Sequence, residues 1–232
     1  MSVRQAVEAL SSPCTGECSL RLYHTRWAAE IAPRGVNVFS KDNSSLVSEF
    51  QPLTEDRWSD FEELFGDHGA YGGCWCMWWR STRREFEERQ GEGNRRAMKA
   101  IVESGEVPGI LAHLEGKPVG WCSVAPRERY GSLERSPVLK RLDDTPVWAI
   151  VCFFVAKGYR GRGLAEALIR GAVEYVRSQG GKVIEAYPTR PRRKRLAPVS
   201  SYMGIPAMFE RAGFVECARP SESKVIMRYV IE

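Results

Sequence analysis

The sequence lacks the features that mark membrane and secreted proteins. No apolar run approaches the ~20 residues that a membrane-spanning helix needs. The opening stretch, MSVRQAVEALSSP, has no apolar core of a signal peptide. The seven cysteines are an odd number in a chain of 232 residues, which favours free thiols in a reducing compartment over a disulfide framework. We therefore expect a cytoplasmic protein without a membrane segment.

Charge gives little support for a nucleic-acid partner. The net charge of +5 is mild and suits a small anionic ligand as well as any polymer. One short basic run, residues 189–195, is either a solvated loop or a contact for an anion, and no aromatic side chains interleave it. A nucleic-acid binder is therefore the last of the functions that we consider.

Composition and length predict one soluble domain with an appendage. The hydrophobic fraction of 43% and the charged fraction of 27% are typical of globular proteins. Residues 1–50 are interrupted repeatedly by Ser, Pro, Gly and Asn, so we expect an N-terminal appendage there, of unknown role. The remaining residues, 51–232, form the predicted main domain.

The most informative stretch is residues 147–176. A continuous apolar run that ends at Val155 predicts a strand, and a turn rich in Gly and Arg follows it. From Leu164 onward, apolar residues recur at helical spacing, which predicts an amphipathic helix. The first amides of a helix lack internal partners and form, with the helix dipole, a site for an anion. The turn is therefore a candidate phosphate site, since its glycines leave the backbone accessible.

The spacing within this turn separates three kinds of phosphate loop. A Walker loop needs a Lys-Ser/Thr pair, which is absent, and the dinucleotide fingerprint G-x-G-x-x-G fails at its third glycine, where Glu166 stands. The pattern Arg160-x-x-Gly163-x-Ala165 instead resembles the R/Q-x-x-G-x-G/A acetyl-CoA loop of the GNAT N-acyltransferases. The stretch Pro206–Phe214 is similar to that family's closing motif, A-x-[YF]-E-x-x-G-F. The resemblance covers about residues 53–231.

The resemblance implies a mixed α/β (α+β) fold with acetyl-CoA as co-substrate. The expected sheet is central and mostly antiparallel, with one splayed pair of parallel strands and flanking helices. The acyl-pantetheine arm is expected between the splayed strands, where backbone N–H groups at Phe153–Val155 polarise the thioester carbonyl. No metal is implied. The residues expected to bind the cofactor are Phe153, Val155, Arg160, Gly161, Arg162, Gly163, Leu164 and Ala165.

The usual acid–base positions of the family are apolar in this chain. Phe209 stands where many members have a proton-donating Tyr, and Trp148 stands where histone-type members have a Glu. As substitutes we consider Tyr202, before the last predicted helix, and Glu185 or Tyr187 on the strand predicted after the central helix. Tyr202 and Glu185 are our candidate catalytic residues.

The remaining segments predict how the domain is completed. Pro52–Phe65 is expected to form a helix capped by Thr54, and Ile110–Leu114 with Pro118–Val124 a β-hairpin. The Trp-rich run, residues 74–79, either fills the gap between helix and sheet or lines an acceptor pocket. The Cys spacing in this run and in the appendage is not that of a structural zinc site.

Two functions from different classes follow. The first is an N-acetyltransferase that transfers acetyl from acetyl-CoA to a primary amine of a small molecule or peptide by direct attack. The second is a non-catalytic acyl-CoA-binding module on the same fold, favoured by the apolar Phe209 and Trp148. Neither the acceptor nor the oligomeric state, a homodimer included, follows from the sequence.

Overall fold

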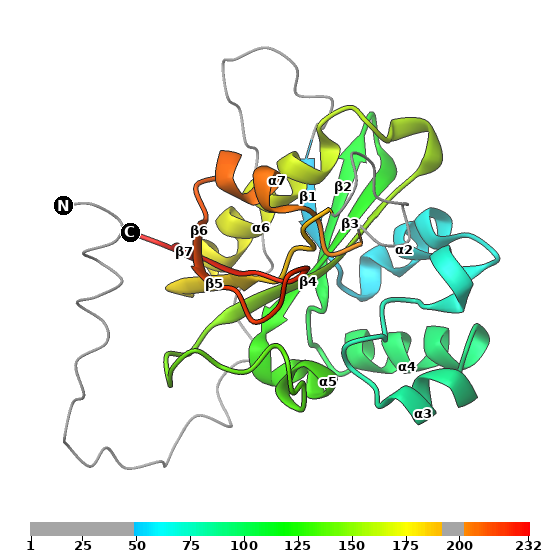
Figure 1. The fold of residues 1–232 in the computed structure, drawn as a ribbon. Helices are drawn as coiled ribbons and strands as arrows, with labels where there is room; N and C mark the ends of the chain where they lie inside the picture. The colour runs from blue at the N-terminus through cyan, green and yellow to red at the C-terminus, as the bar shows by residue number, and fades with distance from the viewer. Residues whose placement is uncertain (1–48, 192–201) are drawn as a thin grey trace. The chain divides into compact units, whose positions relative to one another are not determined.

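A computed structural model describes residues 49–191 and 202–232 of the chain (Figure 1). The predicted appendage, apart from its last two residues, and most of the basic run lie outside the described residues. A seven-stranded sheet in the order β1-β2-β3-β4-β5-β7-β6 forms the centre of the domain. Its strands are β1 Glu49–Pro52, β2 Gly109–Leu114, β3 Lys117–Pro126, β4 Trp148–Val155, β5 Val183–Ala186, β6 Val215–Ala218 and β7 Ile226–Val230.

The sheet is antiparallel except for one pair. The predicted hairpin is confirmed as β2 and β3, and β5 pairs with β7 in antiparallel register. The strands β4 and β5 run parallel, and α6 (Leu164–Ser178) makes the crossover between them. The mixed sheet with a single parallel pair is the architecture that the resemblance implied.

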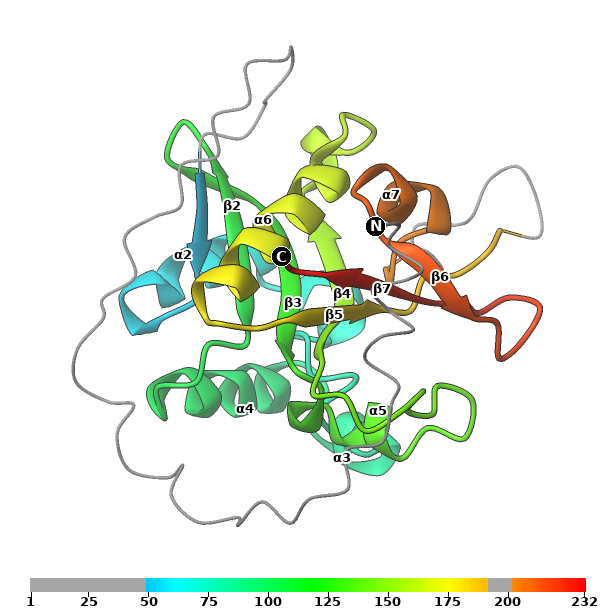
Figure 2. The same cartoon turned by 90° about the vertical axis from the view of Figure 1, so that its left-hand side faces the viewer.

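Helices cover both faces of the sheet (Figures 1 and 2). On one face, α6 packs on β2, β3 and β4, and α7 (Pro206–Arg211) packs beside α6. On the other face, α2 (Trp58–Phe65) packs on β3. The further helices are α3 Arg83–Glu88, α4 Glu92–Glu103 and α5 Gly131–Glu134, with short helical turns η1 Glu55–Arg57, η2 Gly69–Gly73, η3 Arg127–Arg129 and η4 Lys157–Tyr159. No helix in the described part of the chain is long and apolar enough to cross a membrane.

The start of the domain differs from the prediction. The helix expected from Pro52 begins later, because Glu49–Pro52 extends the sheet by pairing with β2. The predicted cap was also wrong. The Thr54 side chain makes no capping bond to the helix backbone; its hydroxyl hydrogen-bonds to the Asp56 carboxylate and accepts from Arg57 instead.

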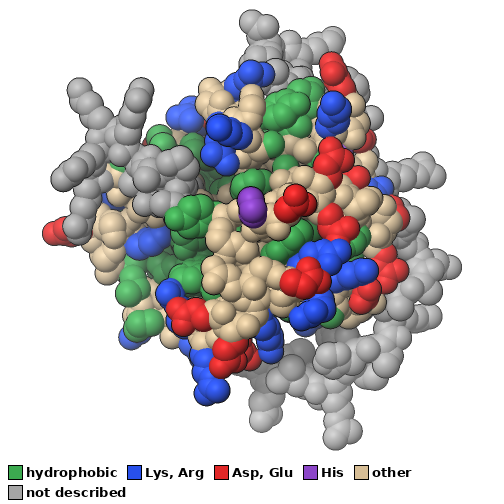
Figure 3. All heavy atoms as spheres, turned by 90° about the vertical axis from the view of Figure 1, so that its right-hand side faces the viewer, with side chains coloured by type: hydrophobic (Ala, Val, Ile, Leu, Met, Phe, Trp, Pro, Cys, Tyr) green, Lys and Arg blue, Asp and Glu red, His purple; other side chains and the backbone are tan. Residues whose placement is uncertain are grey.

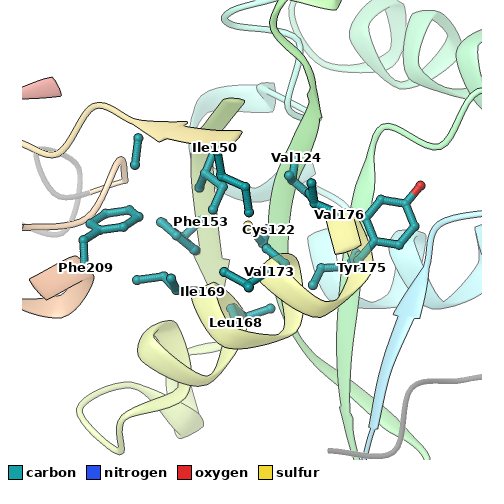
Figure 4. Close-up of a cluster of buried hydrophobic side chains, with 14 of the residues drawn as sticks. Cys122, Val124, Ile150, Phe153, Leu168, Ile169, Val173, Tyr175, Val176 and Phe209 are labelled. Carbon is teal, nitrogen blue, oxygen red and sulfur yellow. The ribbon is translucent and has the colours of Figure 1, made fainter. Parts of the chain in front are cut away.

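The larger apolar core lies between α6 and the sheet (Figure 4). Leu168, Ile169 and Val176 of the helix belong to the same buried cluster as Ile150 and Phe153 of β4. Side chains at this spacing share one helix face, so the apolar period of the sequence accounts directly for the packing. A second core cluster joins α2 to the opposite face of β3.

One glycine lets β1 approach α6. A Cβ on Gly171 would lie 2.6 Å from Cγ of Phe50, a buried ring on β1. The close contact requires a residue without a side chain at this position of the helix. The first strand is therefore built into the main core, although Phe50 falls just before the domain boundary expected from the sequence.

We predict that Gly171→Ala destabilises the domain by about 1–3 kcal/mol, because the added methyl group overpacks the contact with Phe50. Urea unfolding measures the change. Gly158→Ala is the matched control, since a Cβ there meets no atom within 4 Å. Equal stability of the two variants would contradict the packing of β1 against α6.

Candidate acetyl-CoA site

The parallel strands β4 and β5 diverge after three paired residues. Only Trp148, Ala149 and Ile150 of β4 pair with β5, opposite Ile184, Glu185 and Ala186. The rest of β4, up to Val155, keeps β3 on one side and leaves its other edge without a neighbouring strand. An unpaired strand edge presents backbone N–H and C=O groups that another extended group can bind.

A short segment before α7 occupies the first part of this gap. The amide of Phe153 donates to the Tyr202 carbonyl at 2.6 Å, and the amide of Thr189 donates to the Gly204 carbonyl at 3.0 Å. Residues 202–204 thus bridge the two diverging chains. The Phe153 amide, which we expected to polarise the thioester carbonyl, donates to the Tyr202 carbonyl of the chain itself.

The end of β4 remains accessible at Val155. The Ala156 amide donates to the Val119 carbonyl of β3 at 3.0 Å, and Val155 lies opposite Gly120. The N–H groups along an antiparallel strand point alternately toward and away from the neighbouring strand. Because the Ala156 N–H points toward β3, the Val155 N–H points away from β3 and into the gap. The Val155 carbonyl accepts from Arg160 Nε at 2.9 Å, so the glycine loop is tied back to the strand end.

The glycine loop leads into α6 with its amides free. Gly163 is the N-cap of the helix at φ 79°, and its carbonyl accepts the first bonds, from Glu166 and Ala167. The amides of residues 161–165 have no hydrogen-bond partner among the described residues. A Cβ on Gly161 or Gly163 would meet no atom within 4 Å. The loop is therefore an open cradle of the kind that a diphosphate fits.

Charge around the cradle is positive on balance. Arg160 and Arg162 are exposed beside it. The one acidic side chain of the first helical turn, Glu166, is neutralised by Arg211 at 2.7 Å and Arg170 at 2.9 Å, and its hydrogen bond with Arg211 is the main cause of a lowered pKa. An anion at the loop therefore meets the helix dipole without facing an uncompensated carboxylate.

Tyr202 lies where the gap meets the opposite face of the sheet. Its backbone binds β4, and its half-buried side chain packs against the buried cluster that contains Val151 and Tyr187. Burial raises the pKa of Tyr202 to about 12, and interactions with the indoles of Trp78 and Trp79 oppose the rise only in part. The hydroxyl is therefore protonated at neutral pH and is able to donate a proton.

Glu185 lies in a different environment, inside a buried ionic network. Its side chain is 1% exposed, and its oxygens accept from Arg228 Nε at 2.8 Å, Arg127 Nη1 at 3.1 Å and the Tyr187 hydroxyl at 2.6 Å. Arg228 also binds Asp143, and that hydrogen bond lowers the pKa of the Asp143 carboxyl to about 2. Both oxygens of Glu185 are engaged by cations, which favours a structural role and argues against our choice of it as a base.

Sequence reasoning missed the partners of this network. Arg127 and Asp143 stand in a polar stretch and resemble solvated loop residues. In the structure, the Arg127 side chain is 1% exposed and also binds Glu134 at 2.6 Å and the Leu139 carbonyl at 2.7 Å. No periodicity marks these residues, because they meet only after the sheet has formed.

The two apolar residues at the family's acid–base positions belong to the core. Phe209 is fully buried and packs on Phe153 and Phe214, with ring centroids 6.0 and 5.2 Å apart. Trp148 stands edge-on to Tyr175, with centroids 5.9 Å apart. Neither side chain has a group that could exchange a proton with a substrate.

Burial differs from one residue to the next within the Trp-rich run. Trp75 is buried against Phe65, with stacked rings 5.7 Å apart, so it fills the gap between helix and sheet. Trp78 and Trp79 are only half-buried and approach Tyr202.

Hydrophobic side chains gather on the face of the molecule that Figure 3 shows, bordered by Lys and Arg on one side. Within the described residues, no group of three or more His, Cys, Asp or Glu is arranged to hold a metal.

A comparison with protein-family models decides the identity of this fold. The model of the acetyltransferase (GNAT) family matches residues 50–197, more than half of the chain. The chain belongs to the GNAT acetyltransferase family. A comparison of this GNAT chain with curated protein sequences gave no match.

Solved structures similar to this GNAT domain are distant in sequence. They include ribosomal-protein-alanine N-acetyltransferase from Brucella melitensis (17% identity, 78% of this chain and 99% of that chain covered, TM-score 0.45). Another is a GNAT-family acetyltransferase from Streptococcus agalactiae (14% identity, 79% and 95% covered, TM-score 0.46). A third is PaiA N-acetyltransferase from Thermoplasma acidophilum in complex with coenzyme A (12% identity, 79% and 98% covered, TM-score 0.45).

We predict that Glu185→Gln destabilises the GNAT domain by about 3 kcal/mol, because it leaves two buried guanidinium groups without their shared carboxylate. Urea unfolding measures the loss, and Glu216→Gln, on an exposed position of β6, is the control. A variant of normal stability that has lost turnover would instead make Glu185 a catalytic residue.

Proposed function

We propose that this protein transfers the acetyl group of acetyl-CoA to a primary amine of a small molecule or peptide. The observation that carries the proposal is that the glycine loop and the open edge of β4 are joined to each other. The free amides of residues 161–165 lie at the start of α6, and Arg160 ties this loop to Val155 at the open edge of β4. One extended ligand with a diphosphate at one end can therefore use both.

The residues assigned to coenzyme A follow from this geometry. The amides of residues 161–165 hold the diphosphate, with Arg160 and Arg162 supplying positive charge beside it. The amide of Val155 binds the pantetheine arm in the gap between β4 and β5. Phe153 joins this set only if the Tyr202 carbonyl withdraws from its amide.

Transfer requires a proton to reach the departing thiolate. The amine attacks the thioester carbonyl, the C–S bond breaks, and the coenzyme leaves as a thiolate. Tyr202 is the proton donor in our proposal, because its protonated hydroxyl lies beside β4 on the side of the half-buried Trp78 and Trp79. Positioning of the two reactants supplies the rest of the rate enhancement.

We predict that Gly163→Val weakens acetyl-CoA binding at least tenfold, about 1.4 kcal/mol, because its side chain fills the amide cradle. Calorimetric titration measures the affinity. The substitution also strains the backbone at φ 79°, so Gly180→Val, at φ 74° and equally open but at the other end of α6, is the matched control. Equal affinities of the two variants would remove the loop from the binding site.

We predict that Tyr202→Phe lowers kcat by about 100-fold while acetyl-CoA affinity stays unchanged, because the lost hydroxyl serves proton transfer and not binding. Because the pKa of Tyr202 is about 12, wild-type turnover should show no alkaline loss from this group below about pH 11. Steady-state rates across this pH range test both statements. An unchanged kcat in the variant would exclude Tyr202 as the proton donor.

The second candidate function is a non-catalytic acyl-CoA-binding module. The burial of Phe209 and the engagement of both Glu185 oxygens favour it, because they leave Tyr202 as the one acid–base candidate from the sequence with an available hydroxyl. Loss of thioester absorbance in the presence of a panel of amines separates the two functions. Tight acetyl-CoA binding without turnover on any amine would support the binding module.

A further inference from the structure

Two thiols meet on β4 beside the proposed acyl site, and a third lies two residues from one of them in the chain. Cys74 and Cys76 lie in the segment after α2, and Cys152 lies on β4 next to Phe153. The sulfur atoms of Cys76 and Cys152 are 3.4 Å apart, a hydrogen bond between residues 76 positions apart in sequence. Cys74 is two residues from Cys76 in the same turn, and hydrogen bonding from the side chain of Cys76 lowers the pKa of Cys74 to about 7.

The segment that carries Cys74 and Cys76 is fixed in an uncommon backbone conformation. Trp75 and Cys76 have φ values of 34° and 53°, in the left-handed region that residues other than glycine rarely adopt. The Gly73 carbonyl accepts from the Gly91 amide at 3.0 Å and from Asn94 Nδ2 at 3.1 Å, which anchors the segment to the α3–α4 junction. Such strain persists only where the surroundings impose it, and it is concentrated at functional positions.

The same anchoring holds the Cys76 sulfur toward β4. A Cβ on Gly69 would lie 2.0 Å from the Trp75 indole nitrogen, so the turn is built to admit that ring. Trp121 Nε1 lies 2.7 Å from Cys76 Sγ and fixes it from the other side. The short distance between Cys76 and Cys152 is therefore a consequence of packing on three sides.

We propose that Cys74, Cys76 and Cys152 form a reversible oxidation site whose stable product is a disulfide between Cys76 and Cys152. The oxidant is a hydroperoxide, and Cys74 is the thiol that reacts first. It is the half-buried member of the Cys74–Cys76 pair, whereas Cys76 is buried. The proposal concerns the thiols themselves and holds for either function considered above.

The chemistry balances over three steps. The Cys74 thiolate attacks a peroxide oxygen, the O–O bond breaks, and a sulfenic acid forms while the alcohol or water leaves. Cys76 then attacks the Cys74 sulfur and displaces water, forming a disulfide between these two residues. Finally, the Cys152 thiolate attacks the Cys76 sulfur and releases the Cys74 thiolate. Overall, two thiols lose two electrons and two protons, and one hydroperoxide is reduced.

The product would restrain the candidate site. It joins the segment around Trp75 covalently to β4, one residue before the amide that binds the Tyr202 carbonyl. If the protein is the acetyltransferase proposed above, closure of this bond should lower turnover, and reduction should restore it. This consequence rests on the proposed function, whereas the disulfide does not.

The test is a peptide map of the full-length protein after treatment with hydrogen peroxide and alkylation of the remaining thiols. Trypsin releases Cys74 and Cys76 in residues 58–80 and Cys152 in residues 142–157. We expect these two peptides to be joined, to separate on treatment with dithiothreitol, and to stay unlinked in Cys76→Ser and in Cys152→Ser. Cys217→Ser, which removes an exposed thiol elsewhere, should keep the link.

Other results would overturn the proposal. An unlinked wild-type map would exclude the disulfide, and a link that persists in Cys76→Ser would show that Cys74, and not Cys76, is the partner of Cys152. Cys74→Ser should form the same link more slowly, and a rate equal to that of the wild type would remove Cys74 as the entry thiol. Circular dichroism checks that each variant is folded. Absence of turnover on all amines, with the link present, would count against the proposed transferase and not against the oxidation site.

Discussion

The candidate site depends on how briefly β4 and β5 pair. Three residues of each strand hydrogen-bond in parallel register, and beyond Ile150 the strands separate. If the pairing continued to Val155, the backbone groups of β4 would be satisfied within the sheet and no edge would face a ligand. Residues 202–204 hold the gap open by binding Phe153 on one side and Thr189 on the other. The open edge at Val155 is what remains.

The buried ionic network links β5 to neighbouring parts of the domain. Arg228 on β7 and Arg127 after β3 both bind Glu185, so three elements converge on one carboxylate. Burying such a group adds little net stability, because desolvation offsets much of the attraction. Its consequence is positional, since Glu185 and the two arginines come from different parts of the chain and are held together by these bonds. The network therefore ties β5 to β7 and to the chain that follows β3.

Local patterns accounted for much of the fold. The apolar run to Val155, the glycine turn and the helical period from Leu164 each depend on neighbours in sequence, and all three are present. The hairpin β2–β3 follows from alternation and a short turn in the same way. The helix predicted to end at Phe65 is present, but its expected start at Pro52 and its expected cap at Thr54 were wrong, because pairing of β1 with β2 overrode the local preference.

The sequence by itself determined the element order, the family resemblance and the position of the glycine loop, because periodicity and glycine spacing act over a few residues. Only the tertiary structure decided which polar groups are available. It placed Glu185 among arginines, joined the Phe153 amide to Tyr202 and brought Cys76 to Cys152. Contacts of this kind join residues far apart in the chain, and each depends on packing of the whole sheet, which no local pattern records.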